Sequence, residues 1–374
     1  MLGKMRANLL DPGLIVEGGH HLEYDLRVAS ELRSRGIETH VYSHVQVSAK
    51  AREAVSLSAQ VTPLFRVGPY VNWAEIDPVS GELASYLDGA TMLAEDLARV
   101  REAQIWILPS LFASQLYACA LAKPAAALSA CIHVDPTFMA PNGRMWWRHA
   151  FLKARDANLH LNLGVNVPAL EQKYSSLTSD GRINRFPVAH DGAPSGVCKT
   201  ELRRIGFFGH QRPEKGAGLL PSLIPQLLHD GYEVVVQDSG ELVRATSMQG
   251  LIVLPYVPSL AAEVAKCDLI VAPYDPVAYR NKGSGIVWDS VASGVPVVAP
   301  AGTAIGSLVQ STGAGILFAS LNAADVYRSI LEARSNYEQI SKAAFKASLE
   351  WRSRHGIKHF VSAMLGDLGT LSGG

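Results

Sequence analysis

The stretch YRNKGSGIVWDSVASGVPVVAP, residues 279–300, joins a glycine loop to the start of a helix. Gly283, Ser284 and Gly285 leave the backbone free to turn and let a ligand approach closely. The unpaired N–H groups at a helix start favour phosphate, and Asp289, a turn further on, could present its carboxylate to a sugar hydroxyl. The stretch therefore indicates a nucleotide-binding loop or, as the alternative, an ordinary turn and helix with an exposed acid.

A second loop, GHQRPEKGAG at residues 209–218, lies between a predicted strand and a predicted helix. Arg212 and Lys215 are close enough along the chain to bind one diphosphate together. Arg212 would bind through its planar guanidinium group, and Lys215 through its compact ammonium group. Pro213 and Glu214 also suit the start of any solvated helix, so a structural role is the alternative.

A third loop, EGGHH, places Gly18 and Gly19 directly before a helix. Glycines at a helix start again suit a phosphate, and His20 and His21 could reach a ligand. The alternative is that both histidines are ordinary surface residues.

These loops need a scaffold, and the chain alternates predicted strands with predicted helices throughout. RANLLDPG, an amphipathic helix with Leu22, Leu26, Ala29 and Leu32 on one face, and IETHVYS form the first β-loop-α-β unit. A new alternation begins at LRRIGFFGH, after a segment at residues 188–200 that is rich in Gly, Pro and Ser and predicts a linker. The pattern predicts two α/β domains with parallel sheets, whose ligands bind at the carboxyl ends of the strands.

Composition excludes several other classes of protein. The 34 basic and 34 acidic residues give no net charge, so clustered cations for nucleic-acid binding are not expected. The four cysteines are far apart in the sequence, so we predict that they are small residues of the core. Without a predicted signal peptide or membrane span, we expect a cytoplasmic protein.

Two further segments have less regular patterns. RMWWRHAFLKAR, residues 144–155, mixes tryptophans with basic residues and indicates packing on the first domain, an acceptor groove, or peripheral contact with the inner face of a membrane. Residues 43–73 show no clean period and predict irregular, mobile structure on the acceptor side.

The order of the glycine loop, a lone histidine in CIHVDP, G-x-x-R-P-E-K-G and GSGIVWDSVASGVPVVAP resembles the retaining glycosyltransferases of glycosyltransferase family 4. The resemblance is clearest from residue 204 to residue 318. It implies the GT-B fold, an α/β architecture in which two Rossmann-like, doubly wound domains face each other across a cleft. The implied parts are an acceptor-side domain at 1–190, a linker at 191–203, a donor-binding domain at 204–350, and a C-terminal helix at 351–374 that packs back on the first domain.

The resemblance also implies roles for single residues. Arg212 and Lys215 would hold the diphosphate, Asp289 would meet the ribose, and His133 would lie near the donor sugar. Further implied donor contacts are Gly18, Gly19, Asn281, Gly283, Ser284, Gly285 and Ile286.

The chain departs from the family at two places. Where the family carries two glutamates eight positions apart, this sequence has Asn281 and Asp289, which changes how the donor sugar is held. His210 follows the glycine of the phosphate loop where the family has an arginine, so Arg212 is expected to take over that task.

The implied activity is the transfer of a sugar from a nucleotide-diphosphate sugar to a hydroxyl acceptor with retention at the anomeric carbon. No Asp-x-Asp triplet occurs, so we expect no metal and no cofactor, with paired cations and helix-end amides stabilising the departing phosphate. The resemblance favours a glycan or lipid-linked glycan acceptor, as in bacterial surface glycan synthesis.

Two alternatives stay open at this stage, a nucleotide-sugar epimerase of the same fold and a catalytically weakened partner subunit that still binds the donor. A nicotinamide-dependent dehydrogenase is disfavoured, because GSGIVW lacks the third glycine of the dinucleotide fingerprint.

Overall fold

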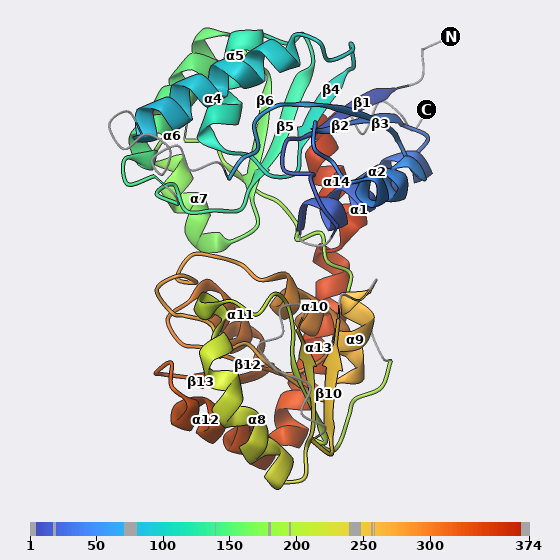
Figure 1. Cartoon of the computed structure of the whole chain (residues 1–374), viewed down its shortest axis with the longest axis vertical. Helices are drawn as coiled ribbons and strands as arrows, with labels where there is room; N and C mark the ends of the chain where they lie inside the picture. Colours follow the sequence, from blue (N-terminus) through green and yellow to red (C-terminus); the bar gives the residue numbers. More distant parts are fainter. Residues whose placement is uncertain are drawn as a thin grey trace. The chain divides into compact units, whose positions relative to one another are not determined.

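The structure is a computed structural model, and it describes residues 5–17, 20–70, 81–138, 140–178, 181–193, 196–238, 248–255, 257 and 259–367. The chain divides into two compact units (Figure 1). The first unit contains residues 1–189 together with 357–374, and the second contains residues 190–356.

Within the described residues, the first unit holds a seven-stranded sheet in the order β3-β2-β1-β4-β5-β6-β7, and all neighbouring strands are parallel. The apolar runs on these strands suit a sheet covered on both faces. The strands are β1 (Arg6–Asp11), β2 (Glu38–His44), β3 (Gln60–Phe65), β4 (Ile105–Leu108), β5 (Ala127–Ile132), β6 (Leu161–Val165) and β7 (Asn184–Arg185).

The described helices of the first unit, except the last one, connect one parallel strand to the next. They are α1 (His20–Ser34), α2 (Ala49–Ser56), α4 (Gly81–Leu97), α5 (Ala113–Ala122), α6 (Gly143–Asp156), α7 (Pro168–Ser175) and α14 (Ile357–Leu365). Helix α14, from the far end of the chain, lies beside α1 (Figure 1). Its residues Phe360, Val361 and Met364 are buried in the same apolar cluster as Leu22 and Val28 of α1.

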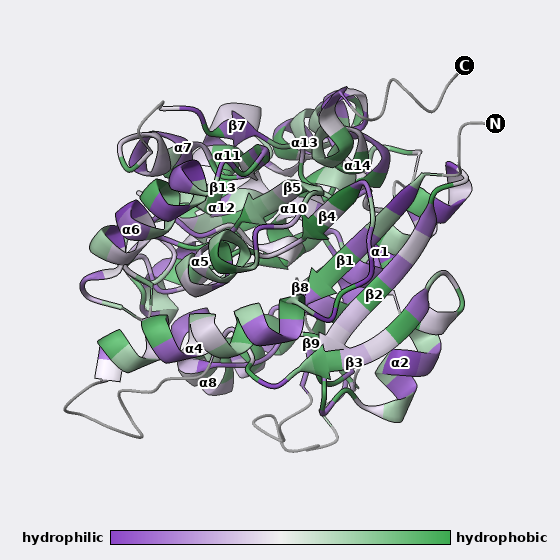
Figure 2. Cartoon of the chain, turned by 90° about the horizontal axis from the view of Figure 1, so that it is seen from above, coloured by the Kyte–Doolittle hydropathy of each residue, from purple (hydrophilic) through white to green (hydrophobic). Residues whose placement is uncertain are grey.

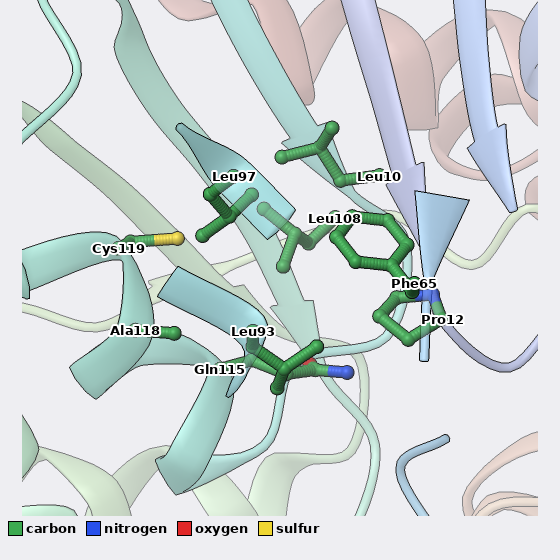
Figure 3. Close-up of a pocket in the computed structure, with 9 residues that line it drawn as sticks. All are labelled: Leu10, Pro12, Phe65, Leu93, Leu97, Leu108, Gln115, Ala118 and Cys119. Atoms are coloured by element: carbon green, nitrogen blue, oxygen red, sulfur yellow. The ribbon is translucent and has the colours of Figure 1, made fainter. Parts of the chain in front are cut away.

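The core of the first unit lies on both sides of its sheet. Helix α4 alternates green and purple segments in Figure 2, as an amphipathic helix does, and its apolar residues Leu93 and Leu97 are buried. These two side chains face Leu10 and Phe65 across a small cavity of about 10 Å³ beneath α5 (Figure 3). A cavity of this size and lining is a packing defect of the core.

The second unit holds a six-stranded parallel sheet among the described residues, in the order β10-β9-β8-β11-β12-β13. Its strands are β8 (Arg204–Phe207), β9 (Glu233–Gln237), β10 (Leu251–Leu254), β11 (Leu269–Val271), β12 (Val297–Pro300) and β13 (Gly315–Phe318). Its helices are η1 (Pro213–Lys215), η2 (Ala217–Leu219), α8 (Leu220–His229), α9 (Leu260–Lys266), α10 (Gly285–Ser293), α11 (Ala304–Thr312), α12 (Ala323–Ser335) and α13 (Tyr337–Arg354). The predicted α/β class with two parallel sheets is thus confirmed.

The prediction of irregular, mobile structure at residues 43–73 is wrong for much of that stretch. Helix α2 begins after Ser48, whose hydroxyl oxygen accepts a hydrogen bond from the Ala51 amide at 3.1 Å. Strand β3 then pairs in parallel with β2. Only Ala51 and Val55 of the short helix are buried, so its sequence shows too few apolar residues for a visible period.

The tryptophans of segment 144–155 lie on α6 and pack within the first unit. Trp147 is buried, with its ring centroid 4.9 Å from that of Tyr174, and Trp146 donates a hydrogen bond to Glu82. Among the described residues, no helix is both long enough and apolar enough to cross a membrane.

Candidate functional site

The first part of the candidate site is the loop that follows β8 in the second unit. Gly209 has a φ of 92°, a conformation that favours glycine. Its amide donates to the side-chain oxygen of Gln237 at 2.8 Å, and Gln211 donates to the Gln237 carbonyl. The end of β9 therefore fixes the shape of the loop that the sequence singled out.

The Lys215 side chain extends from η1 to the loop at Gly209. A Cβ atom at Gly209 would lie 2.8 Å from Nζ of Lys215, so the missing side chain leaves room for the ammonium group. Burial, together with the charges of Arg212 and Lys282, lowers the pKa of Lys215 to about 8, and Glu214 opposes the change. The structure thus partly shields this cation from water without a full counter-charge, and a bound anion would offset the cost.

Lys282 is a further cation near Lys215 that the sequence analysis did not single out. Its Nζ lies 5.4 Å from the Tyr279 ring centroid, and Nζ of Lys215 lies 5.6 Å from that of Tyr274. The two tyrosine rings are 4.4 Å apart. Burial lowers the pKa of Lys282 as well, with Glu214 raising it and Arg212 lowering it.

Arg212 is the more exposed member of this group, with 57% of its side chain accessible and Glu214 at 3.8 Å. We call Arg212, Lys215 and Lys282 the cation cluster. The pKa values of Lys215 and Lys282 are both lowered. Shifts of this kind are common among residues of binding sites.

The start of α10 lies next to the same loop. A Cβ at Gly209 would also come within 3.6 Å of the Ile286 side chain. Ser284 caps the helix, because its hydroxyl accepts a hydrogen bond from the Val287 amide at 3.5 Å. The loop at residues 209–218 and the loop before α10 therefore meet in the second unit.

Gly283 and Gly285 allow close packing at this helix start. A Cβ at Gly283 would overlap the Trp288 ring at 2.1 Å, and one at Gly285 would lie 3.0 Å from the His190 ring. Asn281 is partly buried in the loop before them.

The Asp289 side chain is buried and is paired with a histidine. Its Oδ1 lies 3.0 Å from Nδ1 of His190, and both side chains are almost inaccessible, at 2% and 3%. The His190 backbone carbonyl in turn accepts a hydrogen bond from Trp351 at 2.7 Å. Sequence reasoning missed His190, since it lies 99 residues from its partner in a segment that reads as a linker.

His133 lies at the end of β5 in the first unit, and both of its ring nitrogens are engaged. Nε2 is 2.7 Å from the Pro109 carbonyl, which can only accept, so this nitrogen carries the proton. Nδ1 then accepts from the Asn166 amide at 3.1 Å. Gly18 and Gly19 lie outside the described residues.

The described part of the chain contains no group of three or more His, Cys, Asp or Glu side chains placed to hold a metal ion.

Comparison with known proteins identifies a family for part of the chain. The family described as "Glycosyl transferases group 1" matches residues 203–336, which contain the cation cluster and α10. No curated protein matches the sequence.

Several solved structures share the whole fold at low identity. The Anabaena protein HepE, solved with UDP and glucose, is 14% identical over 99% of this chain and 100% of its own, with a TM-score of 0.66. Sucrose-phosphate synthase from Thermosynechococcus elongatus is 12% identical over 98% of each chain, with a TM-score of 0.66. SnogD from Streptomyces nogalater is 19% identical over 99% of this chain and 100% of its own, with a TM-score of 0.59. The chain therefore has the GT-B fold and carries a glycosyl transferases group 1 domain at residues 203–336.

Proposed function

We propose that the protein is a retaining, metal-independent glycosyltransferase that moves a sugar from a nucleotide-diphosphate sugar to a hydroxyl acceptor. The observation that carries this proposal is the partly buried Lys215 ammonium, which lies against Gly209 beside Arg212 and Lys282. A diphosphate would neutralise this excess of positive charge, and the same charges would stabilise the diphosphate as it departs with the electron pair of the broken bond.

UDP-sugars are the first donors to test. HepE, which has the same fold, was solved with UDP and with UDP-glucose. On this proposal the amides at Gly283, Ser284, Gly285 and Ile286 supplement the cation cluster. Asn281 and Asp289 lie on the sugar and ribose side of the donor, and His190 orients the carboxylate of Asp289. The roles of His133 near the sugar and of Gly18 and Gly19 near the phosphates rest on the family resemblance alone.

The acceptor is proposed to be a glycan or lipid-linked glycan at the inner face of a bacterial membrane. The outer face of α6 supports this, because Arg144, Met145, Arg148, Leu152 and Arg155 are all exposed. Basic and apolar side chains on one helix face suit an anionic lipid surface. Vesicles of phosphatidylcholine with and without phosphatidylglycerol test this: wild type should sediment only with the anionic vesicles, and Arg144→Glu/Arg148→Glu should not.

Thermal-shift measurements with UDP, GDP and ADP test donor binding, because a ligand that binds only the folded state raises the melting temperature. One nucleotide should stabilise the wild type, and Lys215→Ala should remove that shift. Lys346→Ala is the matched control in the same unit, since the Lys346 side chain is 80% exposed. If none of the nucleotides stabilises the wild type, the proposal is wrong.

Product analysis then separates transfer from the two alternatives. Release of UDP together with a new glycoside of unchanged anomeric configuration supports the transferase. Conversion of the nucleotide-sugar to its epimer, or binding without any turnover, supports the epimerase or the partner subunit instead.

A further inference from the structure

Two tyrosines that the sequence analysis did not single out lie beneath the lysines of the cation cluster. Tyr274 follows β11, and Tyr279 lies in the turn that comes next. Both residues are almost inaccessible, with exposed fractions of 2% and 3%, and their ring centroids are 4.4 Å apart. Nζ of Lys215 lies over the Tyr274 ring and Nζ of Lys282 over the Tyr279 ring. Each ammonium group therefore covers the face of a buried ring.

Backbone contacts on both sides hold Lys215 over its ring. The Asp275 amide donates a hydrogen bond to the Glu214 carbonyl at 2.9 Å, which ties the segment after β11 to η1. A Cβ atom at Gly216 would lie 2.1 Å from the Pro273 carbonyl oxygen, so these two backbones are in direct contact. The neighbours of the lysine in the chain are thus held against the neighbours of the tyrosine.

The Asp275 side chain places the second ring. Its Oδ1 accepts hydrogen bonds from the amides of Val277 at 2.7 Å and Ala278 at 2.9 Å, and its carbonyl accepts from the Tyr279 amide at 3.0 Å. An aspartate that accepts from the amides just ahead of it stabilises a tight turn. The turn brings the second tyrosine back to the first, and both belong to one buried apolar cluster.

The Tyr274 hydroxyl reaches the start of α10. It accepts a hydrogen bond from the Ser284 hydroxyl at 3.4 Å, and Oγ of Ser284 accepts from the Val287 amide at 3.5 Å. Because a serine hydroxyl has a single proton, donation to the tyrosine leaves its lone pairs for the helix amide. One tyrosine thus contacts both the Lys215 ammonium and the residue that caps the helix.

An aromatic ring holds a cation without supplying an opposing charge. The negative face of the ring attracts the ammonium group, and the attraction is strongest where water is excluded. A carboxylate in the same position would also attract the ammonium group, but it would compete with an anionic ligand. The rings therefore fix the two lysines and leave their positive charge available to a phosphate.

This inference rests on the proposed function: we propose that Tyr274 is a positioning residue for the diphosphate, whose ring places the Lys215 ammonium group and whose hydroxyl orients Ser284. The lysine and the amide end of α10 then form one site that is already arranged before the donor binds. Charges and amides arranged in advance stabilise a departing phosphate without rearrangement during the reaction.

A nuclear magnetic resonance measurement tests the geometry without any ligand. Protons that lie over an aromatic face are shifted upfield by the ring current. In protein labelled with ¹³C at the ε carbon of lysine, the Lys215 signal should be shifted upfield, and Lys215→Arg identifies it. Tyr274→Phe should keep this shift and Tyr274→Leu should abolish it. An ordinary position of the Lys215 signal in wild type would overturn the proposal.

Calorimetric titrations with UDP and with uridine test the role in binding. Tyr274→Leu removes both contacts, so it should weaken UDP binding about tenfold or more and leave uridine binding unchanged, because uridine carries no phosphate. Tyr274→Phe keeps the ring and loses only the hydroxyl, and it should weaken UDP binding about threefold. An unchanged UDP affinity in Tyr274→Leu would overturn the proposal. So would an equal loss of UDP and uridine affinity, which would indicate a purely structural role.

A double substitution tests the link to α10. In a Ser284→Ala background, Tyr274→Phe should have no further effect on UDP affinity, because the hydrogen bond between the two hydroxyls is already absent. An undiminished effect of Tyr274→Phe in that background would contradict the link.

Tyr337→Leu is the matched control. Tyr337 is a buried tyrosine of the same unit, and its hydroxyl donates to the Asp268 carbonyl at 3.0 Å. The variant should lose stability but bind UDP like wild type. Failure of the proposed function would appear separately, as a wild type that shows the shifted Lys215 signal but does not bind UDP.

Discussion

The Lys215 ammonium group packs closely against Gly209, because a Cβ atom built at Gly209 would lie 2.8 Å from Nζ of Lys215. Gly209→Ala should therefore displace the ammonium group and force a side chain into a backbone with φ of 92°. We expect the free energy of unfolding to fall by about 1 kcal/mol and UDP binding to weaken. Gly218→Ala is the control, since nothing lies within 4 Å of its added methyl group. Equal melting temperatures and UDP affinities for the two variants would contradict the packing described here.

UDP affinity should depend on pH through Lys215. Burial, together with the charges of Arg212 and Lys282, lowers the pKa of this lysine to about 8, so the ammonium loses its proton as the pH rises through that value. Binding of a diphosphate favours the charged form, and affinity should fall about tenfold between pH 7 and pH 9. Calorimetric titration with UDP at both values measures this. Lys215→Arg stays charged throughout, so whatever affinity it retains should vary little.

His190 and Asp289 should stabilise the second unit as a buried pair. His190→Ala would leave the Asp289 carboxylate buried without this partner, which typically costs about 3–5 kcal/mol of unfolding free energy. Urea denaturation measures the change. Lys342→Ala, which breaks the exposed Lys342–Glu338 pair of the same unit, should change stability little. If both variants unfold at the same urea concentration, the buried pair is not a stabilising element.

Asp25 should make the protein less stable as the pH rises. Burial and the charge of Asp11 raise its pKa well above the usual value, so the folded protein keeps a proton that the unfolded chain releases. The free energy of unfolding therefore decreases from the ordinary aspartate range up to the raised pKa. Asp25→Asn removes this penalty, so it should melt above wild type at pH 7 but not at pH 4. Asp156→Asn, at a residue with a 56% exposed side chain, should follow wild type at both values. A wild-type pH dependence in Asp25→Asn would contradict the assignment of the proton.

Local patterns were enough to predict much of the fold. Strand β1 falls within the predicted stretch RANLLDPG, and helix α1 buries Leu22, Ala29 and Leu32 of the apolar face that its periodicity predicted. Helix α2 was missed, since most of its surface faces solvent and only two of its residues are buried. An apolar period is visible only where an element packs against the core.

The candidate site was predictable where neighbouring residues in the chain form it, as in the glycine loop with Lys215. The pairings of His190 with Asp289 and of Asp11 with His21 were not predicted, because each depends on how separate elements pack. For Asp11 a signal was present: an acid at the end of an apolar strand followed by Pro-Gly, with a histidine and a second acid four residues apart on the next helix. Such acids are seldom buried unless they have partners.

The most direct test of the account is a comparison of UDP with uridine by calorimetric titration. The cation cluster should make wild type bind UDP far more tightly than uridine. Lys215→Ala should lose most of that difference and bind uridine as wild type does. If Lys215→Ala binds UDP as tightly as wild type, the diphosphate is not held by Lys215 and the account is wrong.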